Sequence, residues 1–308
     1  MKFDITALGE ILIDFIPDGV DEFGSSRFLK KAGGAPVNLL AVASKIGLET
    51  AFIGKVGNDM FGDFLKETLI ENKICADGLV FDDEHNTTLA FVELDENGDR
   101  NFSFYRKLNA DTFLDKKDIN EQIITSSKVF HFGSLSFTSD ICTKASNYAL
   151  EIAKKSNCII SYDPNYRDKL WNSQEDAAKV MRENLKFADI VKLSKEEAEM
   201  ISGIKGKKEN LLKISKDFDV KIILITDAAN GVEFICNGEI GFLPSFKVKP
   251  VDTTGAGDIF FGTFLSEFLK ENDNLENIKS IERYVEKAIE ISGKSTLKKG
   301  AISSIPIK

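Results

Sequence analysis

Histidine and cysteine are scarce in this sequence, which has two and four of them among its 308 residues. The cysteines form no C-x-x-C pair and lie far apart, at Cys75, Cys142, Cys158 and Cys236. Free thiols in a reducing, cytoplasmic setting are therefore expected. The two histidines, His85 and His131, cannot build a zinc site without paired cysteines, and neither stands near a G-x-S-x-G nucleophile elbow. Zinc chemistry and a hydrolase triad are both disfavoured.

Long apolar runs and an excess of positive charge are also missing. The 40 basic and 49 acidic residues give a net charge of −9 without any basic block, which argues against a nucleic-acid surface and an anionic membrane. Glu10 and Asp14 interrupt the apolar stretch that a signal peptide needs, and no later run reaches transmembrane length without charges. We therefore expect a cytoplasmic protein whose partners are small molecules.

What the sequence does contain is an alternation of short β-branched runs and helical patterns. "KVFHF" precedes a helix expected from about Ser139 to Lys155, and "CIISYD" precedes one from about Ser173 to Phe187. "ADIVKL" and "KIILIT" continue the pattern, which closes with a helix beginning near Asp258 and another from about Ile278 to Thr296. The pattern is typical of βαβ units and predicts an α/β fold with a parallel sheet covered on both faces.

Two segments break this alternation. Residues 11–32 run from "ILIDFIPDG" to "RFLKKAGG", and residues 87–106 give two strand patterns around Asn97-Gly98, a hairpin signal. Phe102, Phe104 and Arg106 share one face of the second strand by its period of two. A sheet edge this rich in phenylalanine would aggregate unless covered. We expect these strands to form a small β lid over a site, with Arg106 reaching into that site. A second copy of the chain is one way to cover the apolar edge of the lid. The alternative is an ordinary sheet edge.

Three residues with minimal side chains precede an acid and an apolar helix in "DTTGAGDIFFGTF". The simplest interpretation is that Asp258 caps the helix. The alternative is an anion site, in which Gly255, Ala256 and Gly257 expose backbone N–H groups to a phosphate. Asp258 would then take a proton from an attacking hydroxyl.

Polar residues gather at the ends of the predicted strands, where parallel sheets bind ligands. They follow "CIISYD", "ADIVKL", "KIILIT" and "KVKPVDTT". We take the last of these segments as a further strand. The polar residues include Asn165, Arg167, Ser194, Glu197, Thr226 and Gly231. Any one of these segments alone would suggest a solvated loop. Together they supply an arginine for phosphate, a carboxylate for hydrated Mg²⁺, an anion hole and a base, which are the parts that phosphoryl transfer requires.

Near the N-terminus, Asp14 follows an apolar strand, and "AGGAPVNLLAVASKIG" gives a Gly33-Gly34 turn before a helix. Asn38 falls in the first turn of that helix, which we expect to stop at Gly47. An acid and an amide can cap and turn the chain, but they also suit the hydroxyls of a sugar. The two glycines between lid and core would allow a hinge.

These motifs resemble the ribokinase-like carbohydrate kinase family. "DTTGAGD" is similar to its second signature and "GKVGNDMFGDFL" to part of its first, while "GEILIDF", "GGAPVN", "FSFYRKLNAD" and "SYDPNYRDKLW" are most like the fructokinase branch. The resemblance implies one ribokinase-like three-layer α/β/α domain over residues 1–308, with a mostly parallel sheet and a β lid from about 12–32 and 87–108. It also implies ATP as phosphate donor, Mg²⁺, and a monovalent cation such as K⁺.

The resemblance further implies roles for individual residues. Asp258 would be the base, and the backbone of Gly255, Ala256 and Gly257 would be the anion hole. The sugar would be held by Asp14, Gly33, Gly34, Asn38 and Arg106. The nucleotide and its hydrated Mg²⁺ would be held by Asn165, Arg167, Ser194, Glu197, Thr226 and Gly231, with Glu197 reaching Mg²⁺ through water. The monovalent cation would be held by Asp252, Thr254, Ser295, Lys298 and Gly300.

Three departures from the family pattern stand out. Ser194 and Ile289 occupy positions where the family often has asparagine, and Ala228 replaces a glycine of the nucleotide turn in "TDAANG". The full set of motifs leads us to expect an ATP-dependent fructokinase, and the departures leave its ATP pose, nucleotide affinity and base preference open. A kinase for another small sugar, such as 2-keto-3-deoxygluconate or ribose, and a sugar or nucleotide sensor without turnover are the alternatives.

Overall fold

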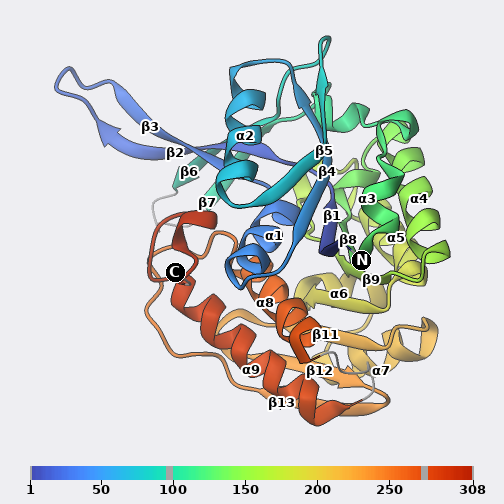
Figure 1. Ribbon diagram of the computed structural model, residues 1–308. Helices are drawn as coiled ribbons and strands as arrows, with labels where there is room; N and C mark the ends of the chain where they lie inside the picture. The colour runs from blue at the N-terminus through green and yellow to red at the C-terminus, as the bar shows by residue number, and fades with distance from the viewer. Residues whose placement is uncertain (1, 95–99, 272–276, 307–308) are drawn as a thin grey trace.

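The computed structural model describes residues 2–94, 100–271 and 277–306. A nine-stranded sheet runs through its centre (Figure 1). In spatial order its strands are β13 (Glu239–Leu243), β12 (Val232–Cys236), β11 (Ile222–Thr226), β10 (Ile190–Ser194), β9 (Ile159–Asp163), β8 (Ser127–Gly133), β1 (Phe3–Leu8), β4 (Thr50–Gly57) and β5 (Ile74–Asp82). Every pairing from β11 to β5 is parallel, and β12 and β13 add an antiparallel hairpin at one edge.

Helices cover both faces of this sheet. One face carries α1 (Ala35–Lys45), α2 (Met60–Glu71), α8 (Ala256–Glu271) and α9 (Ile278–Ser295). The other carries α3 (Glu121–Thr125), α4 (Asp140–Lys155), α5 (Gln174–Asn184), α6 (Lys195–Ser202) and α7 (Lys207–Asp217). Short 3₁₀ turns lie at Ala110–Phe113, Lys116–Asp118, Leu135–Phe137, Asp168–Leu170, Leu185–Phe187, Ala228–Asn230 and Ile302–Ser304.

The strands divide their side chains between these two layers. In β11, Ile222 and Leu224 join the core under α8 and α9, while Ile223 and Ile225 join the core on the opposite face. This division follows from the period of two along a strand. Because both faces are buried, the strands read as continuous apolar runs. The expected three-layer α/β/α fold is confirmed.

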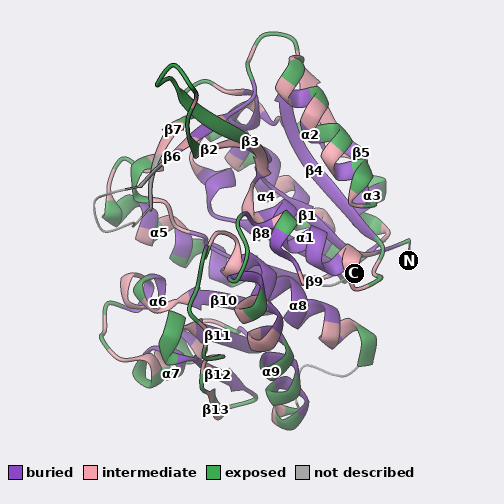
Figure 2. Cartoon of the chain, turned by 90° about the vertical axis from the view of Figure 1, so that its left-hand side faces the viewer, coloured by how far each residue is buried: buried purple, intermediate pink, exposed green. Residues whose placement is uncertain are grey.

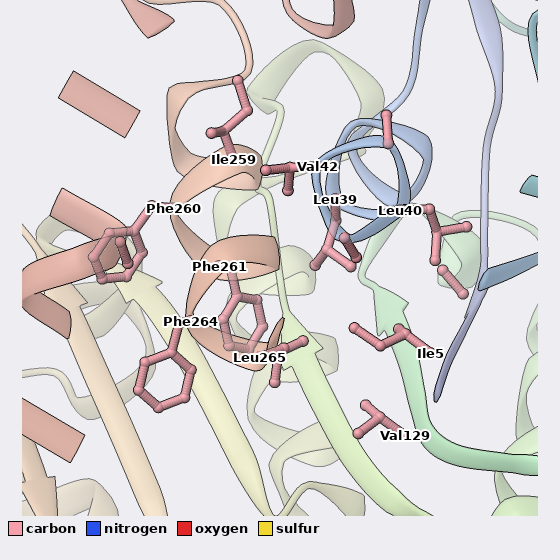
Figure 3. Packing of buried hydrophobic residues seen from close by; sticks show 14 of the residues in the cluster. Ile5, Leu39, Leu40, Val42, Val129, Ile259, Phe260, Phe261, Phe264 and Leu265 are labelled. Atoms are coloured by element: carbon pink, nitrogen blue, oxygen red, sulfur yellow. The ribbon is translucent and has the colours of Figure 1, made fainter. Parts of the chain in front are cut away.

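Helices α1 and α8 pack tightly against each other over the middle of the sheet (Figure 3). A Cβ atom on Gly262 would lie 2.4 Å from Cγ1 of Val42 and 2.6 Å from the carbonyl oxygen of Leu39, so only glycine permits this approach. Phe261 and Phe264 of α8 are fully buried beside the seam. The packing fixes α1 and α8 relative to each other.

The two segments that break the sequence alternation form a separate four-stranded sheet. Its order is β3 (Ser26–Gly33), β2 (Leu12–Val20), β6 (Leu89–Leu94) and β7 (Arg100–Tyr105). The β2–β3 hairpin projects from the body of the molecule, and the outer part of β3 is exposed (Figures 1 and 2). Phe28 and Leu29 of β3 expose 45% and 39% of their surface, and Tyr105 of β7 exposes 64%. The expected Asn97-Gly98 turn and the Phe102 side chain lie outside what the structure describes.

One expected strand is wrong. Residues 244–254, which include all of "KVKPVDTT", form no strand. Pro244 and Pro250 have no N–H to give to a sheet. The chain is tied down after them instead, because the N–H groups of Val251 and Asp252 donate to the carbonyl oxygen of Thr296 at 2.8 and 3.0 Å.

The cap interpretation of Asp258 is also wrong. Helix α8 begins at Ala256, so Asp258 lies inside its first turn. Gly255, with φ of +72°, makes the bend before the helix. By contrast, α1 ends as predicted, with Gly47 following it at φ of +101°. None of the helices in the described ranges combines the length and apolarity that crossing a membrane requires.

Candidate active site

The order of the strands creates a switch point between β1 and β8. From β1 the chain proceeds to β4 and β5 on one side, then returns to β8 and continues through β9, β10 and β11 on the other. Loops at the carboxyl ends of the strands diverge at such a point and leave a crevice for ligands. Asp163 at the end of β9 and Ser194 at the end of β10 lie at this edge of the sheet.

Asp258 is held by two amides from distant parts of the chain. Nδ2 of Asn38, in α1, donates to its Oδ2 at 2.8 Å, and Nδ2 of Asn165 donates to its Oδ1 at 2.9 Å. Asn165 reaches it from a left-handed conformation, φ +51°, in which its own N–H donates to Oδ1 of Asp163 at 3.2 Å. Both carboxylate oxygens of Asp258 are therefore oriented by donors that carry no charge.

Burial and the neighbouring Asp163 carboxylate together raise the pKa of Asp258 to about 6. The hydrogen bond from Asn38 and the charges of Lys192 and Arg167 act in the opposite direction. At neutral pH the carboxyl group is ionised, yet it is more basic than an exposed aspartate. This is the property that a general base needs.

The predicted sugar ligands are connected through the start of α1. A Cβ atom on Gly33 would lie 2.2 Å from Oδ2 of Asp14, so the Asp14 carboxylate rests directly on this glycine. Gly34 has φ of +118° and faces the carbonyl oxygen of Glu10, 2.5 Å from where its Cβ would be. Within the described structure, Oδ1 of Asn38 is buried and accepts no hydrogen bond. It is available to accept one from a ligand hydroxyl.

Arg106 lies just beyond the end of β7, at the base of the small sheet. Its Nε donates to Oδ2 of Asp111 at 2.6 Å, Nη1 to Oγ1 of Thr138 at 2.8 Å, and Nη2 to the carbonyl oxygen of Leu135 at 3.1 Å. Arg106 is thus buried, and its guanidinium is held by the segments that follow β7 and β8. Its contact with a sugar stays a prediction.

Glu10 was not predicted as a site residue. Its Oε1 accepts the N–H of Ala35, the first residue of α1, at 3.1 Å. Burial raises its pKa to about 7, and the charge of Arg106 opposes that rise. A buried acid close to the Gly33-Gly34 turn stabilises the start of α1. The sequence signal was available, since Glu10 directly follows an apolar strand.

Glu197 ties two strand ends together. Its Oε2 accepts the N–H of Ser194 at 2.7 Å, and its Oε1 accepts the N–H of Tyr166 at 2.7 Å, while Oγ of Ser194 accepts the N–H of Glu197 at 3.1 Å. Burial raises the pKa of Glu197. Next to it, the half-buried Arg167 donates from Nη1 to the carbonyl oxygen of Tyr166 at 2.9 Å. The structure therefore brings Asn165, Arg167, Ser194 and Glu197 together.

A cavity of about 490 Å³ adjoins the Gly255–Asp258 turn. Ser194, Thr226 and Gly231 of the predicted nucleotide residues line it together with Ala256 and Gly257 of the predicted anion hole, whereas Asn165, Arg167 and Glu197 are not among its lining residues. Its apolar walls come from Val232, Phe246, Val248, Pro250, Phe260 and Ile289. This is the apolar, concave form that holds the base of a nucleotide. Ala228 also lines it, with a left-handed φ of +41°.

The predicted cation residues meet behind the same turn. Oδ1 of Asp252 accepts the N–H of Thr254 at 2.8 Å, and Oδ2 accepts the N–H of Gly300 at 2.7 Å. The N–H of Lys298 donates to the carbonyl oxygen of Ser295 at 3.2 Å. The Asp252 carboxylate thus holds the two segments together, and the backbone carbonyl oxygens of such a loop can bind a monovalent cation.

The carboxylate of Glu197 also fits Mg²⁺, but the described part of the chain does not surround the ion with ligands of its own. Among the described residues there is no group of three or more histidine, cysteine or acidic side chains that could hold a metal ion. Both oxygens of Glu197 already accept backbone N–H groups, which is compatible with an additional water ligand. Mg²⁺ typically keeps several waters and is bound through nucleotide phosphates.

Sequence reasoning missed one charged pair in the centre of the site. Nζ of Lys192, in β10, lies 3.0 Å from Oδ2 and 3.3 Å from Oδ1 of Asp163, and both side chains are buried. A Cβ atom on Gly257 would lie 3.1 Å from this ammonium group. The signal was a single lysine within the apolar strand "ADIVKL".

Comparisons with known proteins agree with this geometry. The sequence pattern of the family described as "pfkB family carbohydrate kinase" matches residues 2–308. Fructokinase-1 of Zea mays is 39% identical over 304 residues, which cover 98% of this chain and 94% of that protein.

Two solved structures share the fold. The fructokinase of Xylella fastidiosa with bound ATP is 30% identical, with a TM-score of 0.91 over 99% of this chain and 96% of that one. A double mutant of the fructokinase from Vibrio cholerae O395, with fructose, ADP and potassium ion bound, is 30% identical, with a TM-score of 0.89 over 99% and 96% of the two chains. The chain belongs to the pfkB family of carbohydrate kinases.

Proposed function

We propose that this carbohydrate kinase is a fructokinase, which converts fructose and ATP into fructose 6-phosphate and ADP. The observation that carries the proposal is the Asp258 carboxylate, buried and held by Asn38 and Asn165 at 2.8 and 2.9 Å beside the Gly255–Gly257 turn. The similarity to fructokinases over nearly the whole chain supports fructose as the acceptor.

The reaction follows from this arrangement. The hydroxymethyl oxygen of the sugar attacks the γ-phosphorus of ATP, the bond from that phosphorus to the bridging oxygen of ADP breaks, and the hydroxyl proton passes to Asp258. N–H groups of Gly255, Ala256 and Gly257 stabilise the charge on the transferring phosphoryl group, and the N–H of Ala256 has to give up its 3.2 Å hydrogen bond to the carbonyl oxygen of Thr253 to do so. Asp14, Gly33, Gly34 and Asn38 hold the sugar hydroxyls, and Arg106 closes the base of the lid over them.

The nucleotide occupies the cavity lined by Ser194, Thr226 and Gly231, with its phosphates near Asn165 and Arg167. Mg²⁺, when bound, neutralises the phosphates and is reached through water by Glu197. A K⁺-type cation fits the loop of Asp252 and Thr254 with backbone around Ser295, Lys298 and Gly300. Potassium in the related Vibrio cholerae structure supports this ion.

The small sheet acts as a lid on one α/β domain, and its outer face is the expected contact with a second copy of the chain. Phe28 and Tyr105, which both contact the ring of Phe91, expose apolar surface on this face, which favours a homodimer. We place the protein in the cytoplasm. Sedimentation of the wild type and of Phe28→Ser tests the dimer: loss of a dimer in the variant supports the lid contact, and a wild-type monomer excludes it.

The central experiment measures ADP release from Mg·ATP and K⁺ with fructose, ribose, 2-keto-3-deoxygluconate and glucose. The fastest release with fructose, lost by a factor of about 10²–10⁴ in Asp258→Asn, is the expected result. Preference for another sugar would reassign the acceptor. Sugar binding without any release would favour a non-catalytic sensor.

Arg106 has its own test. In Arg106→Ala the Michaelis constant for fructose should rise, since the lid loses its anchor to Asp111, Thr138 and Leu135. An unchanged constant would remove Arg106 from the sugar site.

A further inference from the structure

Lys192 is a charged residue where the sheet is otherwise apolar. It lies in β10 between Val191 and Leu193, which are both fully buried, and it exposes only 6% of its own surface. Burying an ammonium group is costly unless it is paired and hydrogen-bonded. The cost calls for a reason beyond the packing of β10.

The surroundings of the ammonium group are strongly acidic. Asp163 at the end of β9 contacts it directly, and the carboxylates of Glu197 in α6 and Asp258 in α8 raise its pKa, against the effect of burial. His131 in β8 also faces this region, where burial and the charge of Lys192 keep its pKa low, about 3, so it carries no charge. Arg167, after β9, is the other cation whose charge acts on Asp258.

The hydrogen-bonding capacity of this ammonium group is not exhausted. It has three N–H donors, and its hydrogen bonds within the described part of the chain all go to the Asp163 carboxylate. A structural ion pair that only stabilised the sheet could sit anywhere along β10. This one lies against Gly257, whose Cβ would be 3.1 Å from Nζ, at the turn that receives the phosphoryl group.

We propose that Lys192 is a positioning residue for phosphoryl transfer, an inference that rests on the proposed function. Its ammonium group places positive charge behind the Gly255–Gly257 turn and balances the carboxylates around Asp258. Backbone N–H groups alone would bring a highly charged phosphate toward three carboxylates, those of Asp163, Glu197 and Asp258. The charge of Lys192 offsets that repulsion while Asp258 stays ionised as the base.

Two variants separate this role from simple structural support. Lys192→Met removes the cation and leaves Asp163 buried without its partner, which is destabilising in itself. The double variant Lys192→Met with Asp163→Asn removes both charges, and the new amide retains an oxygen to accept the N–H of Asn165. Lys192 lowers and Asp163 raises the pKa of Asp258, and the effect of Asp163 is the larger, so their joint removal should not raise that pKa above the wild-type value.

The experiment compares wild type, single and double variants in full-length protein, by thermal melting and by kcat from pH 5.5 to 9. We expect the single variant to lose at least about tenfold in kcat, with its acid limb moved to higher pH. The double variant should have a melting temperature near that of the wild type, and the acid limb of its pH–kcat profile should return at least to the wild-type position. Its plateau value of kcat should stay as low as that of the single variant. Recovery of kcat to within about threefold of wild type would overturn the proposal, because the pair would then be structural.

A second readout keeps the proposal independent of turnover. The carboxyl ¹³C resonance of Asp258 reports its titration in the unliganded protein. Its midpoint should rise in Lys192→Met and return in the double variant, and an unchanged midpoint in Lys192→Met would overturn the proposal. A wild type without turnover on any sugar would refute the proposed kinase function, whereas this titration would still decide whether Lys192 acts on Asp258.

Discussion

Asn38 and Asp258 are 220 positions apart in the sequence, yet Nδ2 of one donates to Oδ2 of the other at 2.8 Å. The bond joins the first turns of α1 and α8, and it connects the predicted sugar residues to the predicted base. Because Oδ1 of Asn38 accepts no hydrogen bond within the described structure, the same amide can receive a ligand hydroxyl. In the proposed reaction, one side chain would thereby orient both the sugar and the base.

Activity should fall on the acid side with a midpoint near pH 6. Burial raises the pKa of Asp258 to about 6, and the base works only when ionised. Below that pH, kcat/KM should drop by about tenfold per pH unit. Initial rates from pH 5 to 9, in buffers of constant ionic strength, check this; a flat profile down to pH 5 would mean that another group accepts the proton.

Asp258 should also cost stability at neutral pH. Its pKa is raised from 3.8 to about 6, so folding favours the protonated carboxyl group, and the ionised group opposes folding by about 3 kcal/mol above pH 6. Stability should therefore be regained as the pH falls from 6 toward 3.8.

Asp258→Asn tests that cost. It should raise the melting temperature by a few degrees at pH 8 and by less at pH 4.5, since protonation removes the penalty from the wild type. Asp140→Asn, in the exposed first turn of α4, is the matched control and should change little. Equal gains at both pH values would show that charge burial is not the cause.

Ala228→Gly should tighten nucleotide binding. Ala228 has φ of +41° in the wall of the cavity, a conformation that costs a residue with a Cβ about 1–2 kcal/mol and costs glycine almost nothing. The Michaelis constant for ATP should fall severalfold and the melting temperature should rise slightly. Ala229→Gly, one residue along and without a positive φ, should lower stability instead. If both variants behave alike, the turn is not strained.

Gly33→Ala should damage sugar binding through Asp14. The added methyl group would lie 2.2 Å from Oδ2 of Asp14 and must displace that carboxylate. We expect the Michaelis constant for fructose to rise by about tenfold and that for ATP to stay unchanged. The mechanism is checked by adding Gly33→Ala to Asp14→Ala: with the carboxylate already gone, it should cause little further loss. Additive losses would show that Gly33 acts on something else.

Periodicity and turn chemistry were enough to predict the layered architecture. Continuous apolar runs such as "KIILIT" indicated strands buried on both faces, and the polar residues after β9, β10 and β11 marked the correct edge of the sheet. The β12–β13 hairpin was missed although its turn was visible. Asn237 and Gly238 both have positive φ there, as an Asn-Gly hairpin turn requires.

The remaining errors have a common physical origin in contacts between distant segments. "KVKPVDTT" has the composition of a strand, but the two prolines and the bonds from Val251 and Asp252 to Thr296 keep it out of the sheet. Lys192 went unnoticed because its role depends on Asp163 and Gly257, which are far from it in sequence. The local sequence pattern predicts a strand or helix, but the role of a buried charge depends on residues that only the fold brings next to it.

The seam between α1 and α8 has a consequence for how the protein is made. A ribosome has synthesised α1 and the central strands before it translates residue 258, and the Asn38–Asp258 bond closes only after α8 emerges. Domains generally begin to fold from the N-terminus during synthesis, and contacts this distant in sequence form late. A nascent chain should therefore remain catalytically silent until α8 and α9 dock, and activity should appear as one late step.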